Sequence, residues 1–116
     1  MTTLVRGQFV KLFDDVQGAQ ASAADVVFPD GIANKVTLKA ERDTGADLAV
    51  TIYKFDAAGV ATAEKVTLTN AALTAHVTDA GKTHNLEKVI DVEGYAAIRL
   101  AWDGSTNDTS IWAKAD

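Results

Sequence analysis

The chain has no cysteine, one proline, few aromatic residues and no long apolar run. Without cysteine it can form no disulfide, thiolate-bound zinc site or iron–sulfur cluster, and it has no cysteine nucleophile. The N-terminal sequence MTTLVRGQFVKLF lacks an apolar stretch long enough for a signal peptide or a membrane span, so we expect a protein made in the cytosol and not exported. The formal net charge of −5 disfavours nucleic acid and anionic membrane surfaces as partners.

What the chain does contain predicts one folded domain. Its 116 residues are 47% hydrophobic and 23% charged, which is typical of a globular protein and not of a disordered one. A chain of this length buries roughly two-thirds of its surface on folding. Alanine and valine dominate the apolar set, so we expect thin, closely packed sheets in which the few aromatics carry much of the packing.

Apolar and polar residues alternate with a period of two along most of the chain, as in half-buried strands. The residues that this pattern turns inward include Val36, Leu38, Ala40, Leu48, Val50, Ile52, Val60, Val66 and Leu68. Turn signals such as Asp43-Thr44-Gly45 and Asp56-Ala57-Ala58-Gly59 separate the strands. The pattern predicts an all-β fold, a two-layer β-sandwich or jelly roll of about eight antiparallel strands.

Residues 94–112 look like the centre of this fold. We predict two antiparallel strands joined by the polar loop 103–108, with Trp102 and Trp112 close together across the pair. Both tryptophans of the chain would then lie in one unit of the core.

The N-terminal part allows two interpretations. Residues 1–24 form a strand or arm followed by a loop, and residues 25–116 form the β-sandwich; we expect one domain overall. Apolar residues on both faces of 3–13 fit a first core strand or an arm that lies on a partner. On the arm hypothesis, the partner-binding residues are Leu4, Arg6, Phe9, Lys11 and Phe13.

No residue pattern specifies chemistry. His76 and His84 have neither a serine in a glycine elbow nor a carboxylate at metal-ligand spacing, so we expect no catalytic residue, no metal, no cofactor and no enzymatic activity. Glu87 and Asp91 lie on one strand, whereas a glycosidase needs a pair of carboxylates across a cleft.

Two binding hypotheses stay open at this point. Asp103, Asn107 and Asp108 put three oxygen donors on one loop, which fits calcium or, more simply, the geometry of a turn. Tyr53, Phe55 and Tyr95 fit an aromatic platform for sugars, or the filling of a second sheet face or an intersubunit surface.

The phrase VVFPDGIANKVTLKAERDTGADLAVTIYKFDAAG, followed by GYAAIRLAWDG, resembles small β-sandwich structural proteins of tailed-phage virions. The resemblance covers residues 25–102 and includes no active site. It implies a capsid decoration (cement) protein that binds the major capsid protein lattice, or a tail or neck component. It also implies a location in the virion after synthesis in the host cytoplasm. A carbohydrate- or receptor-binding module is the alternative function, and we expect a homo-oligomer, with a trimer among the options.

Overall fold

The computed structural model describes residues 2–16, 22–28, 33–70, 81–102 and 108–116. All regular secondary structure within these ranges is β-strand. A helix long and apolar enough to span a membrane does not occur in them. The strands are β1 (Thr2–Thr3), β2 (Val10–Val16), β3 (Ser22–Val27), β4 (Lys35–Arg42), β5 (Leu48–Phe55), β6 (Ala61–Asn70), β7 (His84–Asp91), β8 (Ala97–Trp102) and β9 (Thr109–Ala115).

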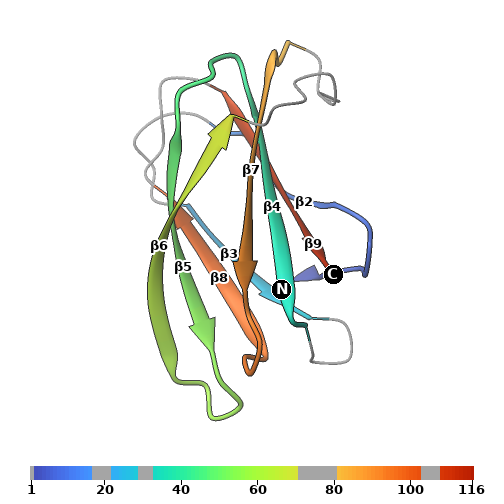
Figure 1. Ribbon diagram of the computed structural model, residues 1–116, viewed down its shortest axis with the longest axis vertical. Coiled ribbons are helices and arrows are strands. Elements are labelled where there is room, and N and C mark those ends of the chain that lie inside the picture. Colours follow the sequence, from blue (N-terminus) through green and yellow to red (C-terminus); the bar gives the residue numbers. More distant parts are fainter. Residues whose placement is uncertain (1, 17–21, 29–32, 71–80, 103–107) are drawn as a thin grey trace.

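The strands form two layers that meet along one side (Figure 1). The first sheet has the order β1-β3-β8-β5-β6 and the second the order β7-β4-β9-β2. Only Thr69 and Asn70 at the end of β6 pair with β7, and this short ladder turns the two layers into one folded-over sheet. The prediction of an all-β sandwich is confirmed, although the described part of the chain has nine strands and β1 pairs with β3 in parallel.

The core lies between the two sheets, where the alternating side chains face each other. The inward residues predicted on β4 and β5, together with Val66 and Leu68 on β6, are buried. Val60 is the exception, because it precedes β6 in the hairpin turn and is 61% exposed. Its apolar side chain fits the alternation, but its position at the turn places it in solvent.

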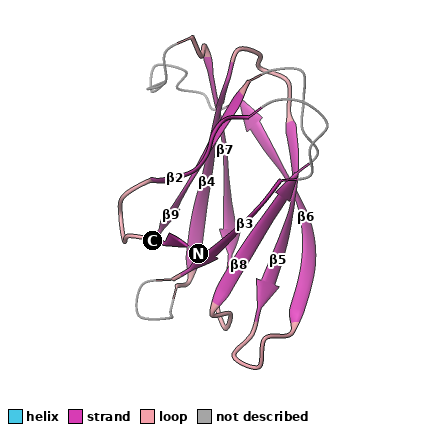
Figure 2. Cartoon of the chain, turned by 180° about the vertical axis from the view of Figure 1, so that it is seen from behind, coloured by secondary structure: helices cyan, strands magenta, loops and turns pink. Residues whose placement is uncertain are grey.

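The N-terminal segment crosses from one sheet to the other. After β1, the Leu4 amide donates to the Val27 carbonyl in the first sheet at 2.9 Å, and the Gly7 amide donates to the Ala115 carbonyl in the second at 2.8 Å. The side chain of Leu4 is 1% exposed between these two bonds. The segment then continues as β2 along β9, and Figure 2 shows the two chain ends side by side. In the described residues it is therefore a structural part of the sandwich.

The predicted pairing across residues 94–112 is wrong. β8 lies between β3 and β5 in the first sheet, whereas β9 lies between β4 and β2 in the second. β8 and β9 therefore lie in different sheets and do not pair with each other as a hairpin. Trp112 belongs to the second sheet, and the side chain of Trp102 lies outside the described part.

Candidate functional site

The outer face of the first sheet carries two aromatic side chains among alanines. Tyr53 and Phe55 point outward from β5, because Val50 and Ile52 on the opposite face of the strand are buried in the core. Phe55 lies directly opposite Ala61 on β6 and Ala97 on β8, and Tyr53 lies opposite Ala63 on β6. Residues directly opposite in antiparallel strands share one face. The result is a surface on which alanines flank two half-buried rings, with Arg99 opposite Tyr53 on β8.

A pocket of about 330 Å³ opens at one end of this face. Phe55, Ala97, Val27 and Arg99 contribute to its wall, and the β5–β6 turn forms its rim. The guanidinium carbon of Arg99 lies 5.5 Å from the centroid of the Phe55 ring, so the charged group covers the ring.

The β5–β6 turn that forms this rim is fixed by its own sequence. One oxygen of Asp56 accepts hydrogen bonds from the amides of Ala58 and Val60, both at 2.9 Å. Gly59 has φ +82°, a conformation that side chains with a Cβ rarely adopt. The Asp56 oxygen that makes these bonds therefore holds the turn in place.

Tyr95 does not join Tyr53 and Phe55 in a three-ring platform. It lies between β7 and β8 and lines a separate pocket, which shares Ala57 and Ala96 with the first. The Lys54 ammonium lies 5.3 Å from the centroid of the Tyr95 ring. The structure therefore brings together two of the three predicted aromatics.

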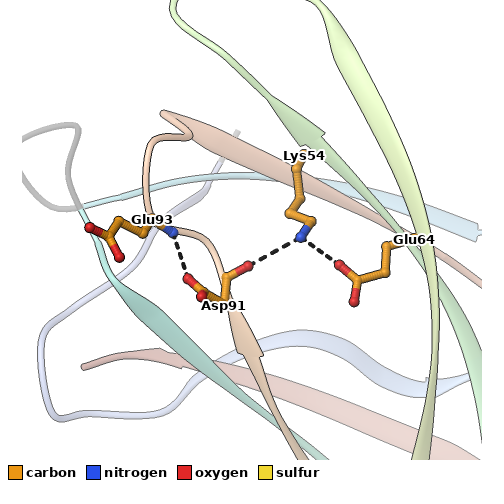
Figure 3. A network of polar contacts seen from close by, with 4 residues as sticks. All are labelled: Lys54, Glu64, Asp91 and Glu93. Carbon is orange, nitrogen blue, oxygen red and sulfur yellow. Dashed lines mark hydrogen bonds and ion pairs between the residues drawn. The ribbon is translucent and has the colours of Figure 1, made fainter.

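Lys54 links the two sheets where β6 and β7 diverge (Figure 3). Its ammonium donates to the Asp91 carbonyl oxygen on β7 at 3.2 Å and forms an ion pair with Glu64 on β6. Asp91 in turn accepts a hydrogen bond from the Glu93 amide at 3.0 Å. Asp91 and Glu64 thus have structural partners here.

The predicted partner-binding residues fall into two groups. Leu4 and Phe13 are buried in the chain's own core, so neither is available to a partner while the segment stays folded. Arg6 and Lys11 are exposed and Phe9 is half-buried. Participation of these three in partner binding stays a prediction.

Lys11 and Phe9 belong to a row of cations and rings on the outer face of the second sheet. Lys11 on β2 lies opposite Trp112 on β9, which lies opposite Lys39 on β4. The ammonium of Lys39 is 4.6 Å from the Trp112 ring centroid and 4.8 Å from that of Phe9. The ammonium of Lys11 is 4.9 Å from Trp112, and that of Lys114 is 4.9 Å from Phe9. We call these five residues the lysine–aromatic row.

The residues considered for catalysis or metal binding do not form a cluster in the described ranges. His84 is half-buried and its Nδ1 lies 2.8 Å from the Thr83 hydroxyl. It pairs across the ladder with Arg42, whose guanidinium donates to the Ala46 carbonyl at 2.9 Å. Burial lowers the pKa of Arg42 below its ordinary value, and the nearby Asp43 carboxylate opposes the shift.

The remaining candidate ligands are mostly outside the described part of the chain. His76, Asp103 and Asn107 lie there, so the calcium hypothesis for the loop stays a prediction. No group of three histidine, aspartate or glutamate side chains that could hold a metal occurs among the described residues.

Comparison with known proteins gives no family. No protein-family model and no curated protein sequence matches the chain. The structure is similar to the SPBc2 prophage-derived protein YomS, with a TM-score of 0.48 and 14% identity over 91% of this chain and 88% of that one.

Two further similarities are to parts of other proteins. One is the enzymatically active domain of tailspike protein 4 of bacteriophage CBA120, at TM-score 0.46 and 13% identity over 86% of this chain and 14% of that one. The other is a family 16 carbohydrate-binding module, at TM-score 0.38 and 15% identity over 83% and 69% of the two chains. At scores and identities this low, none of the three bears on function.

Proposed function

We propose that the chain is a non-enzymatic structural module of a tailed-phage virion, and that it works as a capsid decoration protein on the lattice of the major capsid protein. A tail or neck position is the other location that the sequence resemblance implies. The proposal includes self-association, with a trimer among the possible states. Two observations support it: the resemblance over residues 25–102, and the surface of the first sheet.

The observation that carries the proposal is the apolar outer face of the first sheet. Ala61 and Ala63 on β6 and Ala97 on β8 lie opposite Tyr53 and Phe55, so this part of the face is apolar across three neighbouring strands. Arg99, opposite Tyr53 on β8, is the charged residue at its edge. A contiguous apolar patch on a protein surface marks an interaction site. Alanine side chains lose no rotamer entropy when they are covered, and aromatic residues are enriched in protein interfaces. This composition fits docking onto another protein.

A test places a charge at the centre of this face. Ala63→Glu puts a carboxylate beside Tyr53, and Thr67→Glu makes the same change farther along the outward side of β6. Because a buried unpaired charge is costly, we expect Ala63→Glu to weaken binding to particles of the encoding phage at least about tenfold. Thr67→Glu should bind nearly as well as the unmodified protein.

Co-sedimentation with purified particles measures this binding, and cryo-electron microscopy of the virion locates the protein. Absence of the protein from virions would refute the proposal. Equal particle binding by Ala63→Glu and the unmodified chain would show that this face is not the docking surface.

Carbohydrate binding is the second candidate, because Tyr53 and Phe55 lie on one face beside a pocket. It is less favoured because Arg99 covers the ring on which a sugar would stack. Arg99→Ala separates the two functions. Uncovering Phe55 should strengthen sugar binding on a glycan array, whereas a protein-docking surface should lose particle binding with little change in stability.

A further inference from the structure

Lys39 is nearly buried on the outer face of the second sheet, yet its ammonium has no acidic partner among the described residues. The residue is 7% exposed and its ammonium stands over both Phe9 and Trp112. No ion pair joins it to a carboxylate within the described ranges. Lys114, at the end of the row, is also without an ion pair there. Two ammonium groups on an acidic protein thus contact rings and have no carboxylate partner in the part of the chain that the structure describes.

The row is fixed in place before any partner arrives. Lys11, Trp112 and Lys39 face each other across three hydrogen-bonded strands, and Phe9 covers the next position. Contact with a ring restricts a lysine that would otherwise sample many rotamers, so less entropy remains to be lost on binding. Beyond the row, Arg6 is exposed and donates to the Asp116 carbonyl at 3.1 Å.

We infer that the lysine–aromatic row binds an extended acidic segment of a partner protein, through carboxylates that contact Lys39 and Lys114. Lys11, at the edge of the row, already forms an ion pair with Asp14 at 3.0 Å. This site is on the opposite sheet from the docking face of the proposed function and is independent of it. An alternating acidic strand would place carboxylates at intervals along the row, while its backbone stays in solvent.

Two features favour an acidic peptide over a nucleic acid. Nucleic-acid sites use bare aromatic faces for base stacking, but lysines already occupy the faces of Phe9 and Trp112. The net charge of −5 also repels a long polyanion, whereas a short segment meets mainly the local cations.

The test titrates a hexaglutamate peptide into the full chain and follows the indole N–H signal of Trp112 by NMR. Hexaglutamine is the matched uncharged peptide, and inorganic phosphate and a single-stranded oligonucleotide are the competing anions. Lys114→Met and Lys39→Met remove one ammonium each and keep an apolar stem. Lys65→Met removes an exposed lysine from the first sheet and serves as the control.

We expect saturable binding of hexaglutamate that weakens as salt rises, and no binding of hexaglutamine. Each row variant should lose about fivefold in affinity, as for one partly exposed ion pair, and Lys65→Met should lose none. If Lys39→Met fails to fold, Lys114→Met still tests the inference, because Lys114 is only half-buried and its replacement should leave the fold intact.

Three results would overturn the inference. The first is the absence of hexaglutamate binding, and the second is binding that the two row variants leave unchanged. The third is equal or tighter binding of phosphate or the oligonucleotide, which would make the row a phosphate site. Lys39→Met and Lys114→Met change only the second sheet, so particle binding through the first sheet can succeed or fail separately from peptide binding.

Discussion

Leu4 provides the sharpest test of how the N-terminal segment is used. Its side chain is 1% exposed at the point where the segment crosses between the sheets. If the segment is a structural part of the sandwich, Leu4→Ala should lower the free energy of unfolding. If the segment were an independent arm, the same change would alter association and leave unfolding untouched.

The size of the effect follows from burial. The substitution removes three carbon atoms, and at about 0.8 kcal/mol per buried methylene the lost transfer free energy is roughly 2.4 kcal/mol. A cavity left between the sheets adds to this, which gives about 3 kcal/mol within the usual range of 2–5 kcal/mol. For a domain of this size the melting temperature should fall by roughly 10 °C.

Urea unfolding followed by tryptophan fluorescence measures the change. Val5→Ala is the matched control, because Val5 is the next residue along the chain but is 46% exposed. It should stay within about 0.5 kcal/mol of the unmodified protein. A chain that starts at Gln17 and lacks β1 and β2 should unfold or aggregate. If Leu4→Ala and Val5→Ala unfold alike, or the shortened chain melts normally, the structural role assigned to this segment is wrong.

The other predictions concern three positions. Trp102→Ala should lower the free energy of unfolding by about 3–5 kcal/mol in a urea titration if the side chain shares the buried face of Leu100; a change below about 1 kcal/mol would place the indole in solvent. Lys54→Met removes the link to Glu64 and the Asp91 carbonyl, and should cost up to about 1 kcal/mol, less at high salt. A loss independent of salt would point to packing instead. Gly59→Ala should lower the melting temperature through a strain of about 1 kcal/mol at φ +82°, and an unchanged melt would show that the turn relaxes.

The fold class was readable from the sequence because burial on one face imposes a period of two. Val36, Leu38 and Ala40 alternate with polar residues, and the structure buries all three. The order of the strands was not readable in the same way. β8 and β9 have the alternation and the polar connection of a hairpin, but neither property records which sheet a strand joins.

The lysine–aromatic row shows the same limit at a site. In the sequence, Lys39 alternates with Leu38 and Ala40, which are predicted to point inward, and Phe9 and Lys11 are among the predicted partner-binding residues. A signal for Trp112 was also present, because it alternates with Ile111 and Ala113, which are buried. What the sequence could not supply is the neighbour relation of β2, β9 and β4, which brings these side chains into one row.

The ladder between β2 and β9 has a consequence for biosynthesis. Val10 of β2 pairs with Ala113 of β9, so β2 cannot form this ladder until about a hundred more residues have been synthesised. Until β9 emerges from the ribosome, β2 lacks its only strand neighbour in the described sheets, and the nascent chain carries its apolar residues unpaired. Closure of such a long loop slows folding and prolongs exposure to aggregation. We therefore expect the sandwich to close only once β9 has been made and can pair with β2.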